Sequence, residues 1–130
     1  LPILRKDFPG GWAGDEANKF EASGRSDDEN EMFDHLTTLT KWRNNNKVAQ
    51  NGKLKHFIPE NNMYVYFRYD DQNLVMVILN NSESTRKLDI AQYSEILDDN
   101  TTGKNIFDGK KYNLNDMQIP ANTSMVLEIK

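Results

Sequence analysis

The chain has 130 residues, enough for one domain of ordinary size but too few for a complete (β/α)8 barrel, which needs roughly 250 residues. Its net charge of −4, with 28% charged residues, argues against a nucleic-acid-binding module, which would present a basic face. The chain lacks Cys, which excludes disulfides and sulfur-ligated metals and leaves both the cytoplasm and the bacterial periplasm open as compartments. The longest apolar run, Leu74–Leu79, is far short of the roughly 20 residues of a membrane-spanning helix, so we expect no membrane insertion.

The first 25 residues predict a long loop that is either functional or disordered, since structureless loops of this length are unusual inside a domain. In Arg5-Lys6-Asp7-Phe8-Pro9-Gly10-Gly11-Trp12, proline fixes φ and the glycines permit conformations closed to other residues, which indicates order. Such a loop is typical of a sugar-binding rim: Trp12 would stack on the apolar face of a pyranose while Arg5 and Asp7 bind hydroxyl groups. The alternative is that Arg5 and Asp7 pair to hold the loop and that Trp12 packs inward. The start at Leu1, with neither Met nor a signal-peptide pattern, suggests an excised fragment.

A helix is predicted from Asp27 to Arg43. Ser26 and Glu29 form a capping box, and the acidic residues that follow Ser26 favour the positive end of the helix dipole. We therefore interpret the acidic run 27–31 as a solvated cap and not as a cation or substrate site. Apolar residues recur at the helical period, and asparagines 44–46 end the helix. The apolar positions are Met32, Phe33, Leu36, Leu39 and Trp42.

From residue 53 the pattern changes to about seven short strands with polar turns, which is typical of an antiparallel β-sandwich. Leu74–Leu79 is apolar on both faces and is predicted to be the central strand, with Phe67 and Leu127 in the core. Asp108-Gly109 signals a hairpin turn. The segment 91–98 fits a helical turn or a strand equally well. The predicted strands are 53–58, 63–69, 74–79, 86–90, 105–107, 111–114 and 124–129.

Residues that could carry chemistry are few. His35 and His56 lack a third ligand at metal spacing, and no Gly-x-Ser-x-Gly setting supports nucleophilic catalysis, so we expect neither a metal nor a cofactor. The strand 63–69 places Tyr64, Tyr66 and Arg68 on one face. We interpret this face as a packing surface; the alternative is a carbohydrate-binding platform.

The loop 5–12 resembles the loop after the eighth barrel strand in the cyclomaltodextrinase/neopullulanase branch of the α-amylase superfamily. The resemblance covers nearly the whole chain and is most specific over residues 5–69. It continues through Arg25, Glu29-Asn30-Glu31-Met32-Phe33-Asp34, Trp42-Arg43, Gly52-Lys53-Leu54-Lys55-His56-Phe57 and Tyr64-Val65-Tyr66-Phe67-Arg68-Tyr69.

The resemblance implies that residues 1–47 are the last loop and helix of a truncated catalytic barrel and that residues 48–130 are a C-terminal β-sandwich domain. The parent would cleave α-1,4-glucosidic bonds with retention, in cyclodextrins, pullulan or starch oligosaccharides. None of the family's catalytic carboxylate motifs occurs here, so no catalytic residue is carried over; by resemblance, Arg5, Asp7 and Trp12 line outer sugar subsites.

The expected partners are an α-glucan oligosaccharide, bound through the parent enzyme, and the catalytic barrel of the same chain. Self-association through the apolar helix is also expected. Two alternatives remain: a free-standing carbohydrate-binding β-sandwich and a general protein-interaction module. The helix over 27–43 argues against both, since a self-contained module needs no strongly apolar helix behind such a loop.

Overall fold

The computed structural model describes residues 7–130, which fall into two compact units, 7–37 and Thr38–Lys130, treated separately below. Helix α1 (Asp27–Asn45) is continuous through the division and is followed by the short helix α2 (Lys47–Asn51). The remaining helix, α3 (Ser94–Leu97), adjoins a 3₁₀ turn over Ile90–Tyr93. The strands are β1 (Lys53–His56), β2 (Met63–Tyr69), β3 (Leu74–Asn80), β4 (Arg86–Lys87), β5 (Thr102–Asn105), β6 (Lys111–Asn113), β7 (Gln118–Ile119) and β8 (Thr123–Ile129).

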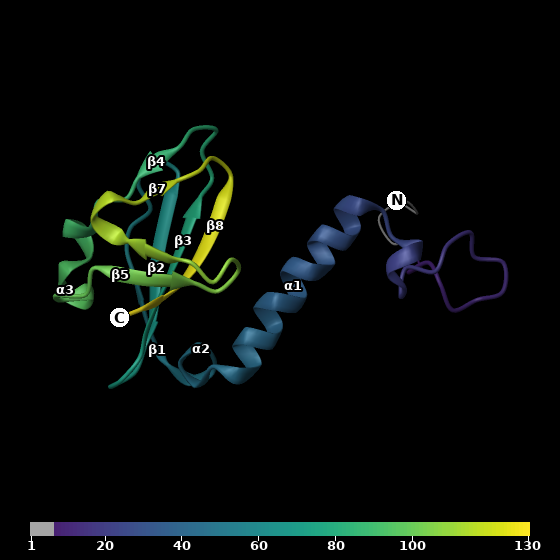
Figure 1. Cartoon of the computed structure of the whole chain (residues 1–130), viewed down its shortest axis with the longest axis horizontal. Coiled ribbons are helices and arrows are strands. Elements are labelled where there is room, and N and C mark those ends of the chain that lie inside the picture. Colours follow the sequence, from purple (N-terminus) through teal and green to yellow (C-terminus); the bar gives the residue numbers. More distant parts are fainter. Residues whose placement is uncertain (1–6) are drawn as a thin grey trace. The chain divides into compact units, whose positions relative to one another are not determined.

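Six strands form one antiparallel sheet in the order β1-β2-β3-β8-β5-β6. Figure 1 shows β3 and β8 side by side in this sheet. Strand β3 lies between β2 and β8 and pairs along its whole length with both. The predicted central strand is therefore confirmed. Asn61 and Asn62 have φ values of 52° and 61° in the turn before β2, the left-handed conformation that a tight hairpin turn requires.

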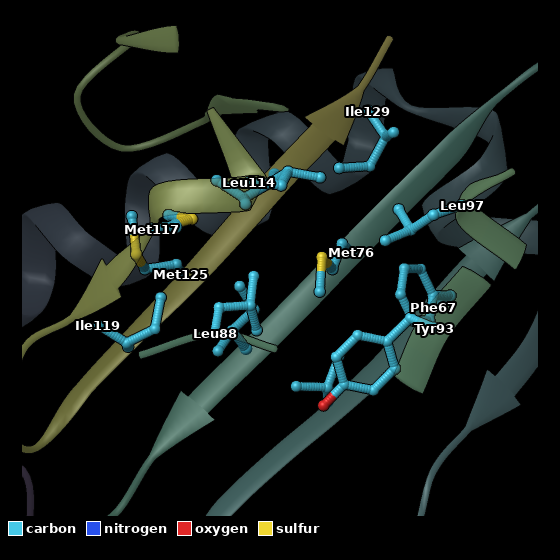
Figure 2. Packing of buried hydrophobic residues seen from close by; sticks show 13 residues of the cluster. Phe67, Met76, Leu88, Tyr93, Leu97, Leu114, Met117, Ile119, Met125 and Ile129 are labelled. Atoms are coloured by element: carbon cyan, nitrogen blue, oxygen red, sulfur yellow. The ribbon is translucent and has the colours of Figure 1, made fainter. Parts of the chain in front are cut away.

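The larger apolar core covers one face of this sheet. Phe67, Met76 and Leu127 come from three adjacent strands and are fully buried, which confirms the prediction for Phe67 and Leu127. Figure 2 shows Phe67 and Met76 within this core. The small sheet of β4 and β7, the turns around α3 and the 3₁₀ turn Leu114–Asp116 supply the opposing layer. The layer's buried side chains are Leu88, Tyr93, Leu97, Leu114, Met117 and Ile119. The fold is mainly β, an antiparallel sandwich type, as predicted.

The other face of the sheet carries a smaller core. Val75, Val77 and Val126 are buried there against Val48 of α2. The C-terminal end of α1 joins them through Leu39 and Trp42, which are partly buried. The Trp42 indole Nε1 donates a hydrogen bond of 2.9 Å to Glu128 Oε1 on β8.

The elements differ from the prediction in several places. The open choice for residues 91–98 is settled as helical, since helix extends over Ile90–Tyr93 and Ser94–Leu97. The Asp108-Gly109 turn is confirmed, but the strand predicted over 105–107 is wrong: β5 spans Thr102–Asn105, and Ile106 and Phe107 pack against the smaller core. Strand β7 was not predicted. The strand predicted over 86–90 is only two residues long. Helix α2 was not predicted; Asn46 caps it by accepting the backbone N–H of Ala49 at 3.1 Å. The assignment of residues 1–47 to a barrel and 48–130 to a separate domain stays a prediction.

We predict that Phe67→Ala lowers the urea midpoint of unfolding strongly. The phenyl ring is fully buried at the centre of the larger core, and such truncations cost about 3–5 kcal/mol. Ile58→Ala is the matched control, because that side chain is 86% exposed and its loss should leave the midpoint unchanged. An unchanged midpoint for Phe67→Ala would show that the core assignment is wrong.

A buried amide fastens the end of β3 to the loop after β7. Asn80 is 3% exposed, and its Nδ2 donates to the backbone carbonyls of Ser84, Ile119 and Pro120 at 2.8–3.1 Å. Its Oδ1 accepts from the backbone N–H and the hydroxyl of Ser82. Every hydrogen-bonding group of this amide is therefore used, as a buried polar group requires.

We expect Asn80→Ala to destabilise the Thr38–Lys130 unit, because buried carbonyl and hydroxyl groups would lose their partner, at about 1–3 kcal/mol for each unsatisfied group. The urea midpoint measures the effect. Asn81→Ala, at the exposed neighbouring position, is the control. Equal midpoints for the two variants would contradict the clamping role.

Candidate functional site

Within residues 7–37, an apolar pocket of about 740 Å³ lies between the N-terminal loop and the first turns of α1. Its walls hold several large side chains that are about half exposed or more, including Phe8, Met32 and Phe33 at 59%, 59% and 48%. The lining consists of Asp7, Phe8, Pro9, Lys19, Phe20, Arg25, Asp28, Glu29, Met32, Phe33 and Leu36. Apolar surface gathered in this way marks an interaction site more often than scattered exposed residues do.

The loop is ordered by one carboxylate. Asp15 Oδ2 accepts the backbone N–H of Gly10 at 2.7 Å and that of Trp12 at 3.3 Å. Gly10 has a φ of 112°, which residues with a side chain rarely adopt, so the sequence needs glycine where the chain turns. The Lys19 N–H donates to the Pro9 carbonyl at 2.9 Å and closes the loop. Phe8 and Phe20 then meet edge to face, with their ring centroids 4.9 Å apart.

The predicted capping box starts α1 and also supplies the polar rim of the pocket. Glu29 Oε2 accepts the Ser26 N–H at 2.7 Å, and Ser26 Oγ accepts the Glu29 N–H at 3.3 Å. Lys19 also pairs with Glu29. The hydrogen bond from Lys19, followed by that from the Ser26 backbone, lowers the pKa of the Glu29 carboxyl below its usual value.

Arg25 joins the loop to the helix. Its Nε donates to Asn30 Oδ1 at 2.8 Å and its Nη1 to the Lys19 carbonyl at 2.9 Å. The guanidinium lies 4.0 Å from the centre of the Phe33 ring, in cation–π geometry. The rim charges Lys19, Arg25 and Glu29 are thus engaged in holding the pocket wall.

The predicted sugar-binding residues fall in different places. Arg5 lies outside the described residues. Asp7 lines the pocket, whereas Trp12 is 78% exposed in the loop and is absent from the pocket lining. Trp12 therefore does not pack inward in this structure, whereas the alternative pairing of Arg5 with Asp7 involves a residue outside the described part of the chain. The sequence prediction missed Asp15, whose role depends on the folded loop, and Phe20, which sits in a polar stretch without periodicity.

The second aromatic candidate lies on β2. The rings of Tyr64 and Tyr66 are 5.5 Å apart and tilted by 36°, and His56 meets Tyr64 edge-on at 6.4 Å. Tyr66 is partly buried against the smaller core, and this burial raises the pKa of its hydroxyl. The predicted division of the strand is confirmed, since Val65 and Phe67 face the larger core. A carbohydrate platform here stays a prediction.

Within residues 7–130, no group of three or more His, Asp or Glu residues is placed to hold a metal ion. No helix in the described part of the chain is long and apolar enough to cross a membrane. His35 lies on α1 and His56 at the end of β1, in separate elements.

Comparison with known proteins identifies the family of the domain that contains the six-stranded sheet. A family model described as the cyclo-malto-dextrinase C-terminal domain matches residues 54–128, more than half of the chain. The chain belongs to the cyclo-malto-dextrinase C-terminal domain family. The match runs from β1 to β8 and confirms the resemblance found in the sequence.

Solved structures of α-amylase-family enzymes share the fold of this cyclo-malto-dextrinase-type domain. An Anoxybacillus α-amylase aligns at a TM-score of 0.62 with 17% identity, over 76% of this chain and 22% of its own. AmyP bound to maltotriose gives 0.66 with 11% identity, over 81% and 22%. Trehalulose synthase MutB gives 0.56 with 15% identity, over 72% and 17%. The chain thus spans about a fifth of the length of these structures.

Proposed function

We propose that this chain is the non-catalytic C-terminal part of an α-glucan-degrading hydrolase. The parent would cleave α-1,4-glucosidic bonds in cyclodextrins, pullulan or starch oligosaccharides by a retaining mechanism. The observation that carries the proposal is the cyclo-malto-dextrinase C-terminal domain match over residues 54–128. The crystallised complexes of AmyP with maltose and maltotriose support α-linked glucose oligomers as the substrate class.

In this proposal the loop and α1 complete the catalytic barrel, which covers the apolar pocket lining. Met32 and Phe33 gain little burial within residues 7–37, and each large side chain left in water forgoes roughly 1.5–3 kcal/mol. The sheet braces the barrel through the other end of the same helix, where Trp42 packs on the smaller core and bonds to Glu128. Asp7 and Trp12, with Arg5, would line outer sugar subsites.

We predict that the pure chain releases no sugar from starch, pullulan or cyclodextrins, as measured by reducing ends against a buffer blank. Glycoside hydrolysis needs two carboxyl groups facing each other across the bond, roughly 5–10 Å apart. The positive control is the proposed parent enzyme, in which this chain follows its catalytic barrel. It should hydrolyse these glucans with retention. Release by the chain alone that is abolished by changing one of its own acids would overturn the proposal.

A free-standing sugar-binding sandwich is the second candidate, and the paired rings of Tyr64 and Tyr66 favour it. Titration of the chain with maltotriose followed by calorimetry separates the two. Loss of binding in Tyr64→Ala, with Trp12→Phe unaffected, would support the free-standing module. The opposite pattern would support the barrel-derived loop.

We also predict that the isolated chain self-associates through the apolar side chains at the start of α1. Light scattering at rising protein concentration should show a mass that increases beyond that of one chain, and Phe33→Asp should reduce the increase. Ile58→Asp is the matched control, since Ile58 is exposed on the other unit and far from α1 in sequence. A strict monomer with a mobile Phe33 ring would refute the prediction.

A further inference from the structure

Trp12 stands on an ordered loop while its own ring contributes little to packing. Its side chain is 78% exposed, although an indole gains more from burial than most side chains do. The loop around it is nevertheless held by backbone bonds, from Asp15 N–H to the Trp12 carbonyl at 3.3 Å and from Lys19 N–H to the Pro9 carbonyl at 2.9 Å. Ordering this segment costs conformational entropy, and burial of the indole offsets little of that cost.

Asp15 is the side chain that fixes the backbone of Trp12 directly. Its Oδ2 accepts both the N–H of Trp12 and that of Gly10, so one oxygen ties together the two sides of the turn. Both bonds are made to a single oxygen, so asparagine could supply an equivalent acceptor whereas alanine could not.

Asn18 contacts the same turn. Its Oδ1 accepts the Phe20 N–H at 3.1 Å. A Cβ on Gly10 would lie 2.4 Å from this oxygen, and a Cβ on Gly24 would lie 1.9 Å from the Asn18 backbone carbonyl. Two glycines therefore let the chain close around Asn18 from both sides, which leaves the turn little freedom to move.

We infer that Asp15 is a positioning residue that presents the Trp12 indole, before any ligand arrives, as a stacking surface for a pyranose ring of an α-1,4-glucan. This inference rests on the proposed function, which supplies the ligand class. The flat apolar face of a sugar ring matches an exposed indole, and a stacking residue that is already ordered loses less entropy on binding. Asp15 itself need not contact the sugar.

The test uses the whole chain labelled with 5-fluorotryptophan and ¹⁹F NMR. The chain has two tryptophans, so the spectrum has two resonances, and Trp12→Phe assigns them. Trp42 lies in the other unit and reports on the integrity of the fold during the same titration. Maltotriose should shift the Trp12 resonance saturably, and cellotriose, with β-linked glucose, should do so more weakly.

Asp15→Ala should narrow the Trp12 line before ligand is added, because the loop becomes mobile. The same variant should weaken maltotriose binding about tenfold, the size expected from losing one or two hydrogen bonds. Asp15→Asn should retain binding to within about threefold, and the Trp42 resonance should stay in place in both variants. Rescue by asparagine separates the acceptor role from the negative charge.

Two results would overturn the inference: no saturable change at Trp12 with maltotriose, or equal affinity of Asp15→Ala and the unchanged chain. Neither result bears on whether the parent hydrolyses α-glucans, which the sugar-release assay decides. Conversely, binding at Trp12 together with an inactive extended protein would sink the proposed function and leave the positioning role intact.

Discussion

Burial of strand β3 on both faces is the constraint from which the rest of the sheet unit follows. Met76 and Val77 are consecutive residues, yet each is buried in a different core. Pairing with β2 and β8 extends these positions into two rows, and the side chains alternate with a period of two, so a one-residue slip would exchange the rows. The register is therefore fixed by both cores at once.

A strand buried on both faces needs two covers, and different segments of the chain supply them. Segments after β3 provide the first, clamped by the Asn80 amide at the end of that strand. The second includes Val48 and the end of α1, which precede β1, together with Ile106 and Phe107, which follow β5. Glu128 has two donors there, the Trp42 indole and the Asn46 amide at 3.4 Å, so the sheet and the helix that precedes it are coupled through hydrogen bonds as well as packing.

Sequence periodicity was sufficient where an element is long and its pattern is local, as in α1, β2, β3 and β8. It failed where tertiary packing decides. Gly103 has no side chain that could contribute to an alternating pattern in β5. A Cβ at this position would lie 3.1 Å from the Leu127 side chain on β8, so that side chain would have to shift to make room. In the N-terminal loop, the sequence identified Asp7 and Trp12 as unusual but not Asp15 or Asn18, because their hydrogen bonds and close contacts exist only after the loop has closed.

Helix α1 meets two environments along its 19 residues. Near its C-terminus, Trp42 gains both burial and a hydrogen bond, which is enough to explain an indole at that position. Near its N-terminus, Met32 and Phe33 stay about half exposed, although the capping box and Arg25 already hold the first turns. The Phe33 ring also holds the Arg25 guanidinium, so the local fold accounts for part of its apolar character. The apolar surface of Met32 and Phe33 that stays exposed is what the proposed cover by a further protein surface would explain.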